Sequence, residues 1–267
     1  MSTDSGYVAI DGTEMYWESR GSGGTPLLLV HGGYGVTSEF DALADRWSRD
    51  RQVIAVELDG HGHTRRSGRP FRWQTFGNDI ADVVRGLGPD PVDLLGYSLG
   101  GGASLRCAIQ HPSLVRKLVL LSAPHRRDAW YPEIRAAFDA MSAATLFEQL
   151  RHSPLYAAWE KVTPDPSAFP ALIDATGDLL RQPYDWSAEV AALPMPVLLV
   201  YGDADSIPPS VAAEFHGLLG GGKRDAGWDG SMRSPSWLTI LPATHYDILA
   251  AQALPGTVAQ FTGVMPG

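Results

Sequence analysis

The feature that most restricts the fold of this chain is a series of short, almost wholly apolar runs bounded by turn-forming residues. The runs have the length of strands, and they lack the alternation of a strand with one solvated face. Continuous apolarity is typical of parallel strands that are covered by helices on both faces. We therefore expect strands at residues 26–30, 52–58, 91–97, 117–123, 196–202 and 237–242.

Helix-like segments separate these runs, and the alternation of strand and helix is characteristic of an α/β protein. The first segment, "YVAIDGTEMYWES", contains Asp-Gly between two alternating runs and predicts a β-hairpin. The sequence thus predicts a mostly parallel central sheet flanked by helices. The helices are expected at residues 38–48, 75–87, 99–110 and 208–219.

Residues 124–193 break this alternation, because they contain helical stretches and no strand-like run. We expect a core formed by residues 1–123 and 194–267, with residues 124–193 inserted as a helical cap. The insert is either a subdomain packed on itself or a lid that lines a pocket, and we favour the lid because inserted segments often cover active sites. Its aromatic residues include Trp130, Tyr131, Phe138, Phe147, Tyr156, Trp159 and Phe169.

Composition excludes several classes of protein. The 267 residues are 44% hydrophobic and carry a net charge of −9, which is unsuited to a nucleic-acid-binding surface. The single Cys107 excludes an intramolecular disulfide and suits a reducing compartment. The first residues lack a basic and apolar leader, and no apolar run is long enough to span a membrane. We expect a cytoplasmic protein without nucleic-acid or membrane partners; its oligomeric state is not indicated.

One serine stands at a junction suited to catalysis. In "DLLGYSLGGGASL" Ser98 follows an expected strand and precedes an expected helix, with Gly96 and Gly100 on either side. A G-x-S-x-G turn in this setting exposes the hydroxyl on a strained backbone, and small neighbours allow the segments to approach closely. The alternative is a glycine-rich turn with a capping serine. A catalytic serine also needs a base, which a third group orients.

Such partners follow the later strands. Asp203 and Asp205 come directly after the run at 196–202, at the carboxyl edge where ligands bind in parallel sheets. His245 lies on a loop after the last strand. The order Ser98, Asp205, His245 is the nucleophile–acid–base order of this architecture.

Taken together, the motifs resemble those of the α/β-hydrolase superfamily over essentially the whole chain. The resemblance is strongest to the serine-nucleophile branch, which includes small-molecule carboxylesterases and enol-lactonases. The motifs occur in the family's order: "HGGYG" at 31–35, "ELDGHGHT" at 57–64, "GYSLGG" at 96–101, "YGDADSIPP" at 201–209 and "ATHYDI" at 243–248.

The resemblance implies an α/β-hydrolase fold and assigns roles to residues. Ser98 is then the nucleophile, His245 the base and Asp205 the acid, with Asp203 and, more remotely, Asp128 as alternative acids. The backbone N–H groups of Leu99 and Gly33 would form the oxyanion hole, with Tyr34 as the alternative to Gly33. His31 would brace the loop and not act as a base.

The segment "ELDGHGHT" departs from the family pattern. Glu57 and Asp59 occupy positions where an aspartate and an arginine are commoner. His61 and His63 with Asp59 are chemically suitable zinc ligands, but they lie inside a turn motif and a fourth ligand is not evident. We expect no metal and no organic cofactor.

The resemblance implies a serine hydrolase that cleaves an ester or lactone of a small, partly apolar molecule through an acyl-enzyme. The alternatives are carbon–carbon bond hydrolysis, amide or aminopeptide hydrolysis, perhydrolysis, and a small-molecule receptor with little turnover. Arg126, between His125 and Arg127 near the mouth, is a candidate for a substrate carboxylate or a solvated surface charge. The role of the glycine-rich loop 217–236 is not indicated. The candidate substrate-binding residues are Tyr34, Arg126, Trp130, Tyr156 and Trp159.

Overall fold

A single eight-stranded sheet runs through the protein in the computed structural model, which describes residues 3–88 and 91–263. The ends of the expected core, residues 1–2 and 264–267, lie outside the described residues. The strand order is β1-β2-β4-β3-β5-β6-β7-β8, and only the pairs β1–β2 and β2–β4 are antiparallel. The strands are Thr3–Ile10, Thr13–Arg20, Leu27–Val30, Val53–Val56, Val92–Tyr97, Val115–Leu121, Val197–Ala204 and Trp237–Thr244, numbered β1 to β8.

This architecture confirms the predicted α/β fold, and each expected strand and the hairpin are present. Alternate residues of β3 point into different cores, with Leu28 in one hydrophobic cluster and Leu29 in the other. Burial on both faces is the reason why these strands read as continuous apolar runs.

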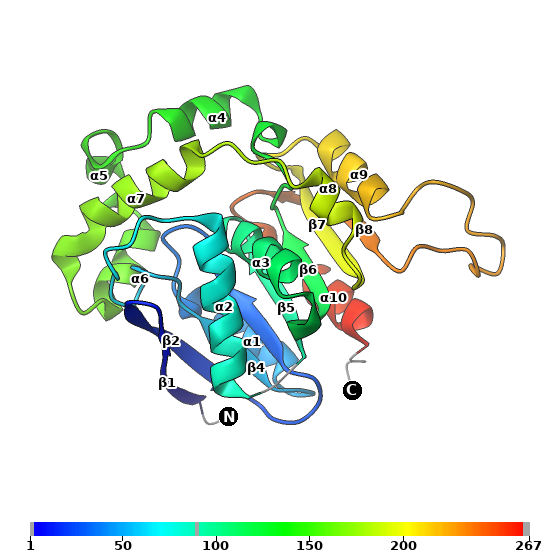
Figure 1. Cartoon of the computed structure of the whole chain (residues 1–267), viewed down its shortest axis with the longest axis horizontal. Helices are drawn as coiled ribbons and strands as arrows, with labels where there is room; N and C mark the ends of the chain where they lie inside the picture. Colours follow the sequence, from blue (N-terminus) through cyan, green and yellow to red (C-terminus); the bar gives the residue numbers. More distant parts are fainter. Residues whose placement is uncertain (1–2, 89–90, 264–267) are drawn as a thin grey trace.

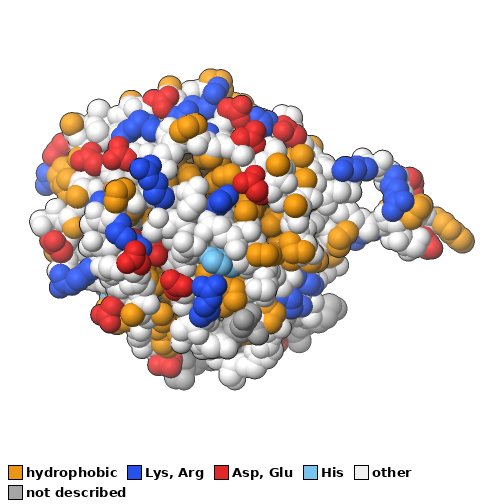
Figure 2. Space-filling model, in the orientation of Figure 1, with side chains coloured by type: hydrophobic (Ala, Val, Ile, Leu, Met, Phe, Trp, Pro, Cys, Tyr) orange, Lys and Arg blue, Asp and Glu red, His pale blue; other side chains and the backbone are white. Residues whose placement is uncertain are grey.

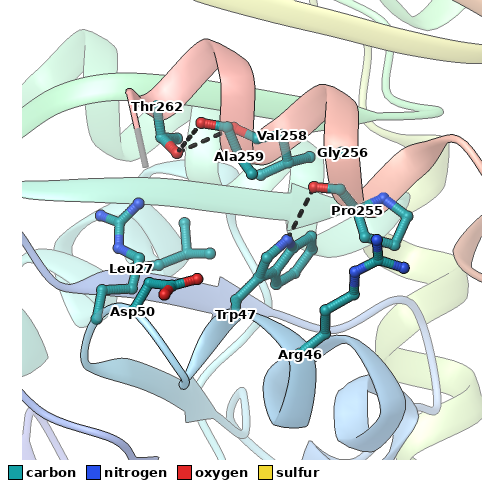
Figure 3. A pocket seen from close by; sticks show the side chains of 10 residues that line it. Leu27, Arg46, Trp47, Asp50, Pro255, Gly256, Val258, Ala259 and Thr262 are labelled. Carbon is teal, nitrogen blue, oxygen red and sulfur yellow. Dashed lines mark hydrogen bonds between the residues drawn. The ribbon is translucent and has the colours of Figure 1, made fainter. Parts of the chain in front are cut away.

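Helices cover both faces of the sheet (Figure 1). α2 (Trp73–Leu87), α3 (Leu99–Gln110) and α9 (Pro209–Leu218) pack on one face. α1 (Asp41–Trp47) and α10 (Leu254–Thr262) pack on the other, where the indole Nε1 of Trp47 donates a 3.1 Å hydrogen bond to the carbonyl of Pro255 beside a small cavity (Figure 3).

The expectation of burial on both faces is wrong for β8. This strand pairs only with β7, so it forms an edge of the sheet, and Ile240 is 39% exposed. The apolar run at 237–242 predicted the strand but not its edge position, because pairing partners are not encoded in a single run.

Residues 124–193 are largely helical and lie together along one side of the molecule (Figure 1). The two ends of this segment are joined by backbone hydrogen bonds from Arg127 N to Tyr184 O and from Trp186 N to His125 O, at 2.9 and 3.0 Å. Its helices are α4 (Pro132–Asp139), α5 (Ala143–Leu150), α6 (Pro154–Val162), α7 (Phe169–Arg181) and α8 (Ser187–Ala191).

A long loop joins α9 to β8 and projects from the body of the molecule (Figures 1 and 2). Trp228 in this loop is fully exposed, and Figure 2 shows Lys and Arg side chains along it. Within the described residues, the structure contains no helix long and apolar enough to cross a membrane.

Candidate active site

Ser98 lies on a strained turn between the end of β5 and the start of α3. Its backbone has φ 53° and ψ −116°, a conformation that L-residues rarely adopt. A Cβ atom at Gly96 would collide with the carbonyl oxygen of Gly100, and one at Gly100 with that of His31. The glycines around the serine are therefore required by close backbone approach, as the sequence motif indicates.

The turn brings Ser98 to a histidine from the other end of the chain. The Oγ atom of Ser98 lies 2.9 Å from Nε2 of His245, and Nδ1 of His245 lies 2.9 Å from Oδ1 of Asp205. His245 follows β8, Asp205 follows β7 and Ser98 follows β5, so the ends of three parallel strands at one edge of the sheet supply the three groups. This hydrogen-bonded chain is the arrangement that activates a serine hydroxyl.

The buried carboxylate of Asp205 is held in its ionised form. Burial alone would raise its pKa, but the hydrogen bond and charge of His245, the Ser122 hydroxyl and the Gly202 N–H together hold the pKa below its ordinary value. The carboxylate can thus orient His245 and stabilise it as an imidazolium.

The other candidate acids do not reach the histidine. Asp203 is exposed, and its Oδ1 accepts a 3.0 Å hydrogen bond from the backbone N–H of Ala243. Asp128 is also exposed, and it pairs with Arg126 at 2.5 Å. The geometry therefore favours Asp205 alone.

Two supporting residues were not found by sequence reasoning. The hydroxyl of Ser122, at φ 51° directly after β6, donates to Oδ2 of Asp205. The phenol of Tyr97 donates a 2.7 Å hydrogen bond to the carbonyl of His245. The only available signal was position, since each stands at the carboxyl end of a strand beside the site.

The candidate oxyanion donors lie beside the serine. Leu99 is the first residue of α3, where backbone N–H groups have no partner within the helix. Gly33 also lies next to this residue, since a Cβ atom at Gly33 would be 3.8 Å from Cδ1 of Leu99. Tyr34 has φ 62°, and its phenol reaches Sδ of Met141 at 3.3 Å in the inserted segment.

A cavity of about 400 Å³ opens onto Ser98 and His245. Core residues form one part of its wall, including Tyr34, Glu39 and Trp73. The inserted segment forms an almost wholly apolar part, with Trp130, Ile134, Phe138, Met141, Leu146, Leu150, Leu155, Thr176, Leu180 and Tyr184.

Of the candidate substrate-binding residues, Tyr34 and Trp130 line the cavity. The structure does not place Arg126, Tyr156 or Trp159 in its lining. Arg126 forms ion pairs with Asp128 and, at 2.6 Å, Glu214.

Tyr156 and Trp159 contact other parts of the inserted segment and the core. The Tyr156 hydroxyl donates to Glu160 at 2.9 Å, and its ring packs edge-on against Phe169. Trp159 is buried, and its Nε1 donates to the carbonyl of Gly60 at 3.2 Å. The lack of a strand-like run identified the segment, but its aromatic content did not distinguish pocket-facing from core-facing rings.

The unusual segment 57–64 has a structural role. Oε1 of Glu57 accepts a 3.0 Å hydrogen bond from the N–H of Thr37, and its Oε2 lies 3.0 Å from Nδ1 of His63. Oδ1 of Asp59 accepts from the N–H of Ser67 at 2.8 Å. Across the described part of the chain, no group of three His, Cys, Asp or Glu side chains is arranged to hold a metal ion.

His31 and His61 are buried neighbours, with ring centroids 4.8 Å apart. Burial lowers the pKa of His31 to about 3 and that of His61 to about 4, so both rings are neutral. Nε2 of His31 accepts a 3.1 Å hydrogen bond from the N–H of Leu58, and Nδ1 lies 2.7 Å from the carbonyl of Gly32. His31 thus connects the two loops, as the resemblance implies.

Comparison with known proteins places these observations in a family. A model of the alpha/beta hydrolase fold family matches residues 25–224, three quarters of the chain. The chain belongs to this family.

Individual relatives differ in the reactions their names describe. A pimeloyl-[acyl-carrier protein] methyl ester esterase of Neisseria meningitidis serogroup C is 31% identical over 215 residues, which cover 74% of this chain and 82% of that protein. A 2-hydroxy-6-oxo-2,4-heptadienoate hydrolase of Pseudomonas putida is 40% identical over 104 residues, only 38% of either chain. The solved enol-lactonase of Burkholderia xenovorans LB400 superposes with a TM-score of 0.71 at 19% identity, covering 97% of this chain and all of that one, and shares the fold.

Proposed function

We propose that the protein is a serine hydrolase that cleaves a carboxylic ester or lactone of a small, partly apolar substrate. The observation that carries this proposal is the continuous hydrogen-bonded chain from Ser98 through His245 to the ionised Asp205, open to a cavity. A hydrolase family and esterase relatives support the same reaction class.

In the proposed mechanism Ser98 attacks the substrate carbonyl while His245 accepts the hydroxyl proton at Nε2. The N–H groups of Leu99 and Gly33 stabilise the oxyanion of the tetrahedral intermediate. His245 then returns the proton to the leaving alcohol, which leaves an acyl group on Ser98. A water molecule, deprotonated by His245, hydrolyses this acyl-enzyme and regenerates the serine.

The lining of the cavity supports a substrate with an apolar part. About 400 Å³ is the size of a small-molecule site, and the inserted segment contributes mainly aliphatic and aromatic side chains. We further propose that residues 124–193 act as a cap whose inner face selects the substrate, because α4, α5 and α7 all contribute lining residues.

A substrate panel tests the proposed reaction against the alternatives. The panel consists of p-nitrophenyl esters of increasing chain length, lactones, amides and carbon–carbon bond substrates, assayed with wild type and Ser98→Ala. Steady-state turnover of esters or lactones that depends on Ser98 is the expected result. Turnover restricted to another bond type, or a single acylation without turnover, would contradict it and indicate another reaction or a receptor.

Phe138→Ala should alter substrate preference. The Phe138 ring lines the cavity and packs edge-on against Trp130, with the ring centroids 5.2 Å apart. Removing its contact with an apolar acyl group costs about 1–3 kcal/mol of binding. We expect kcat/KM for a well-fitting ester to change about tenfold or more, with the ranking shifted towards bulkier acyl groups in a chain-length series.

Trp159→Ala is the matched control in the same segment. This buried ring lies outside the cavity lining, so its removal should cost about 3–5 kcal/mol of folding stability. The melting temperature should fall while the ranking of substrates stays as in wild type. If Phe138→Ala also loses only stability, the cap does not select the substrate.

Metal removal should leave the activity intact. The proposed steps use side chains, backbone N–H groups and water, so dialysis against EDTA should not lower kcat/KM for an ester. A loss that one divalent ion specifically restores would contradict the mechanism and direct attention to His61 and His63.

A further inference from the structure

A second carboxyl group, that of Glu39, lines the cavity beside the serine. Glu39 lies in the short 3-10 helix Thr37–Phe40, and its Oε2 accepts a 3.0 Å hydrogen bond from the N–H of Gly32. Gly32 is itself adjacent to the nucleophile, since a Cβ atom there would be 3.6 Å from Cβ of Ser98. Glu39 belongs to none of the sequence motifs described above, and it takes no part in the proposed mechanism.

No cation is available to neutralise this carboxyl group within the described lining. The other titratable side chains there are His245 and the phenols of Tyr34, Tyr97, Tyr184 and Tyr246, and the lining from α4, α5 and α7 carries no charge. His31, behind the same loop, is neutral, and Asp205 lies on the far side of His245.

Glu39 is half-buried in the cavity wall, and the loss of solvation there raises its pKa to about 7, against the opposing effect of the Gly32 N–H. The carboxyl group is therefore neutral below about pH 7 and negative above it. The negative charge of Glu39 also contributes to the raised pKa of Tyr97, after the larger effect of burial. Glu39 therefore acts electrostatically on the residue that directly precedes Ser98.

We propose that Glu39 is a specificity-determining residue whose ionised carboxylate selects against carboxylate-bearing substrates and in favour of uncharged esters of the same size. The inference rests on the proposed ester hydrolysis and adds the charge class of the substrate. A substrate carboxylate in this cavity would face a like charge in an apolar, poorly screened environment without an Arg or Lys to accept it.

Two esters of similar length test this selectivity, p-nitrophenyl valerate and mono-p-nitrophenyl glutarate, whose free carboxylate is ionised throughout the range used. The quantity measured is the ratio of kcat/KM for the glutarate ester to kcat/KM for the valerate ester. The ratio cancels effects on the shared chemistry of Ser98 and His245. Between about pH 6 and about pH 8, Glu39 of the wild type becomes ionised and the ratio should fall about tenfold.

Glu39→Gln should raise this ratio about tenfold at about pH 8 and remove its dependence on pH. Glutamine is the appropriate substitution because its side-chain oxygen still accepts from the N–H of Gly32 and keeps the loop in place. A ratio that stays as in wild type, with both esters slowed equally, would overturn the proposal and leave Glu39 a positioning residue for the loop.

A binding measurement separates this inference from the proposed function. Calorimetric titration with 4-phenylbutyramide and 4-phenylbutyrate at about pH 8 measures binding without turnover. Wild type should bind the amide about tenfold or more tightly than the carboxylate, and Glu39→Gln should bind both with similar affinity. Equal binding of both by wild type would overturn the charge selectivity. Failure of the proposed function has a different signature, namely no ester hydrolysis by wild type or undiminished hydrolysis by Ser98→Ala.

Discussion

Replacement of Ser98 or His245 by alanine should lower kcat for a p-nitrophenyl ester by about 10³-fold or more. The two side chains share one proton across a 2.9 Å hydrogen bond, so neither activates the reaction without the other. Steady-state hydrolysis by purified variants, with burst kinetics for wild type, measures the effect. Residual rate should remain, because the N–H groups of Leu99 and Gly33 still stabilise the oxyanion.

The double variant provides the control for this prediction. Ser98 and His245 act as one unit, so their losses of kcat should not multiply. The double variant Ser98→Ala, His245→Ala should have nearly the same kcat as the less active single variant. The small Ser98 side chain can be truncated with little effect on the melting temperature. His245 is buried and contacts Trp130 and Asp205, so His245→Ala should lower the melting temperature, and its kcat is measured well below that temperature. Full activity in Ser98→Ala would reject the assignment of the nucleophile.

Asp205→Asn should reduce kcat by about 10²- to 10⁴-fold while leaving the fold intact. The carboxylate accepts from Nδ1 of His245, which keeps the proton on Nδ1 and leaves Nε2 free to receive the serine proton. An amide NH₂ group in its place donates to Nδ1 and favours the wrong tautomer. The shape of the side chain is retained, and the N–H of Gly202 still finds an acceptor.

Asp203→Asn is the matched control, two residues away on the same strand end. Asp203 is exposed and contacts the backbone of Ala243 and not the histidine, so kcat should change by less than about threefold. Circular dichroism and thermal unfolding of both variants exclude a folding defect. The opposite order of activities would move the acid to Asp203.

Much of the fold was predictable because burial on both faces leaves a clear signal. Strands such as β3 and β5 are apolar throughout, and the alternation with helices determines a parallel sheet. The position of β8 at the edge of the sheet was not predicted, and neither was helix α10. An edge strand and a helix packed at the end of the chain depend on tertiary neighbours that a local pattern does not specify.

The central residues of the site were predictable for a different reason. Ser98 has a strained backbone that demands glycine neighbours, and this demand is visible as a motif. The partners Asp205 and His245 then follow from their positions after the last two strands. Chain order and the carboxyl-edge rule predict His245 and leave Asp203 and Asp205 as candidate acids, and the resemblance to the α/β-hydrolase superfamily favours Asp205.

Other parts of the site could not be derived from the sequence. Trp130 and Trp159 are equally aromatic, yet one lines the cavity and the other packs against Gly60. The orientation of a ring depends on how the helices of the insert pack on the core. Glu39 and Ser122 were missed because a single carboxylate or hydroxyl in a loop becomes informative only when its neighbours are known.

The central claim, that Ser98 is an activated nucleophile, is tested most directly by covalent labelling with a fluorophosphonate and peptide mass spectrometry. The account predicts one phosphonyl group on the peptide that contains Ser98, with parallel loss of ester hydrolysis. His245→Ala should be labelled far more slowly, and Ser98→Ala should not be labelled. Labelling of wild type at another residue, or labelling of Ser98→Ala at the wild-type rate, would contradict the claim.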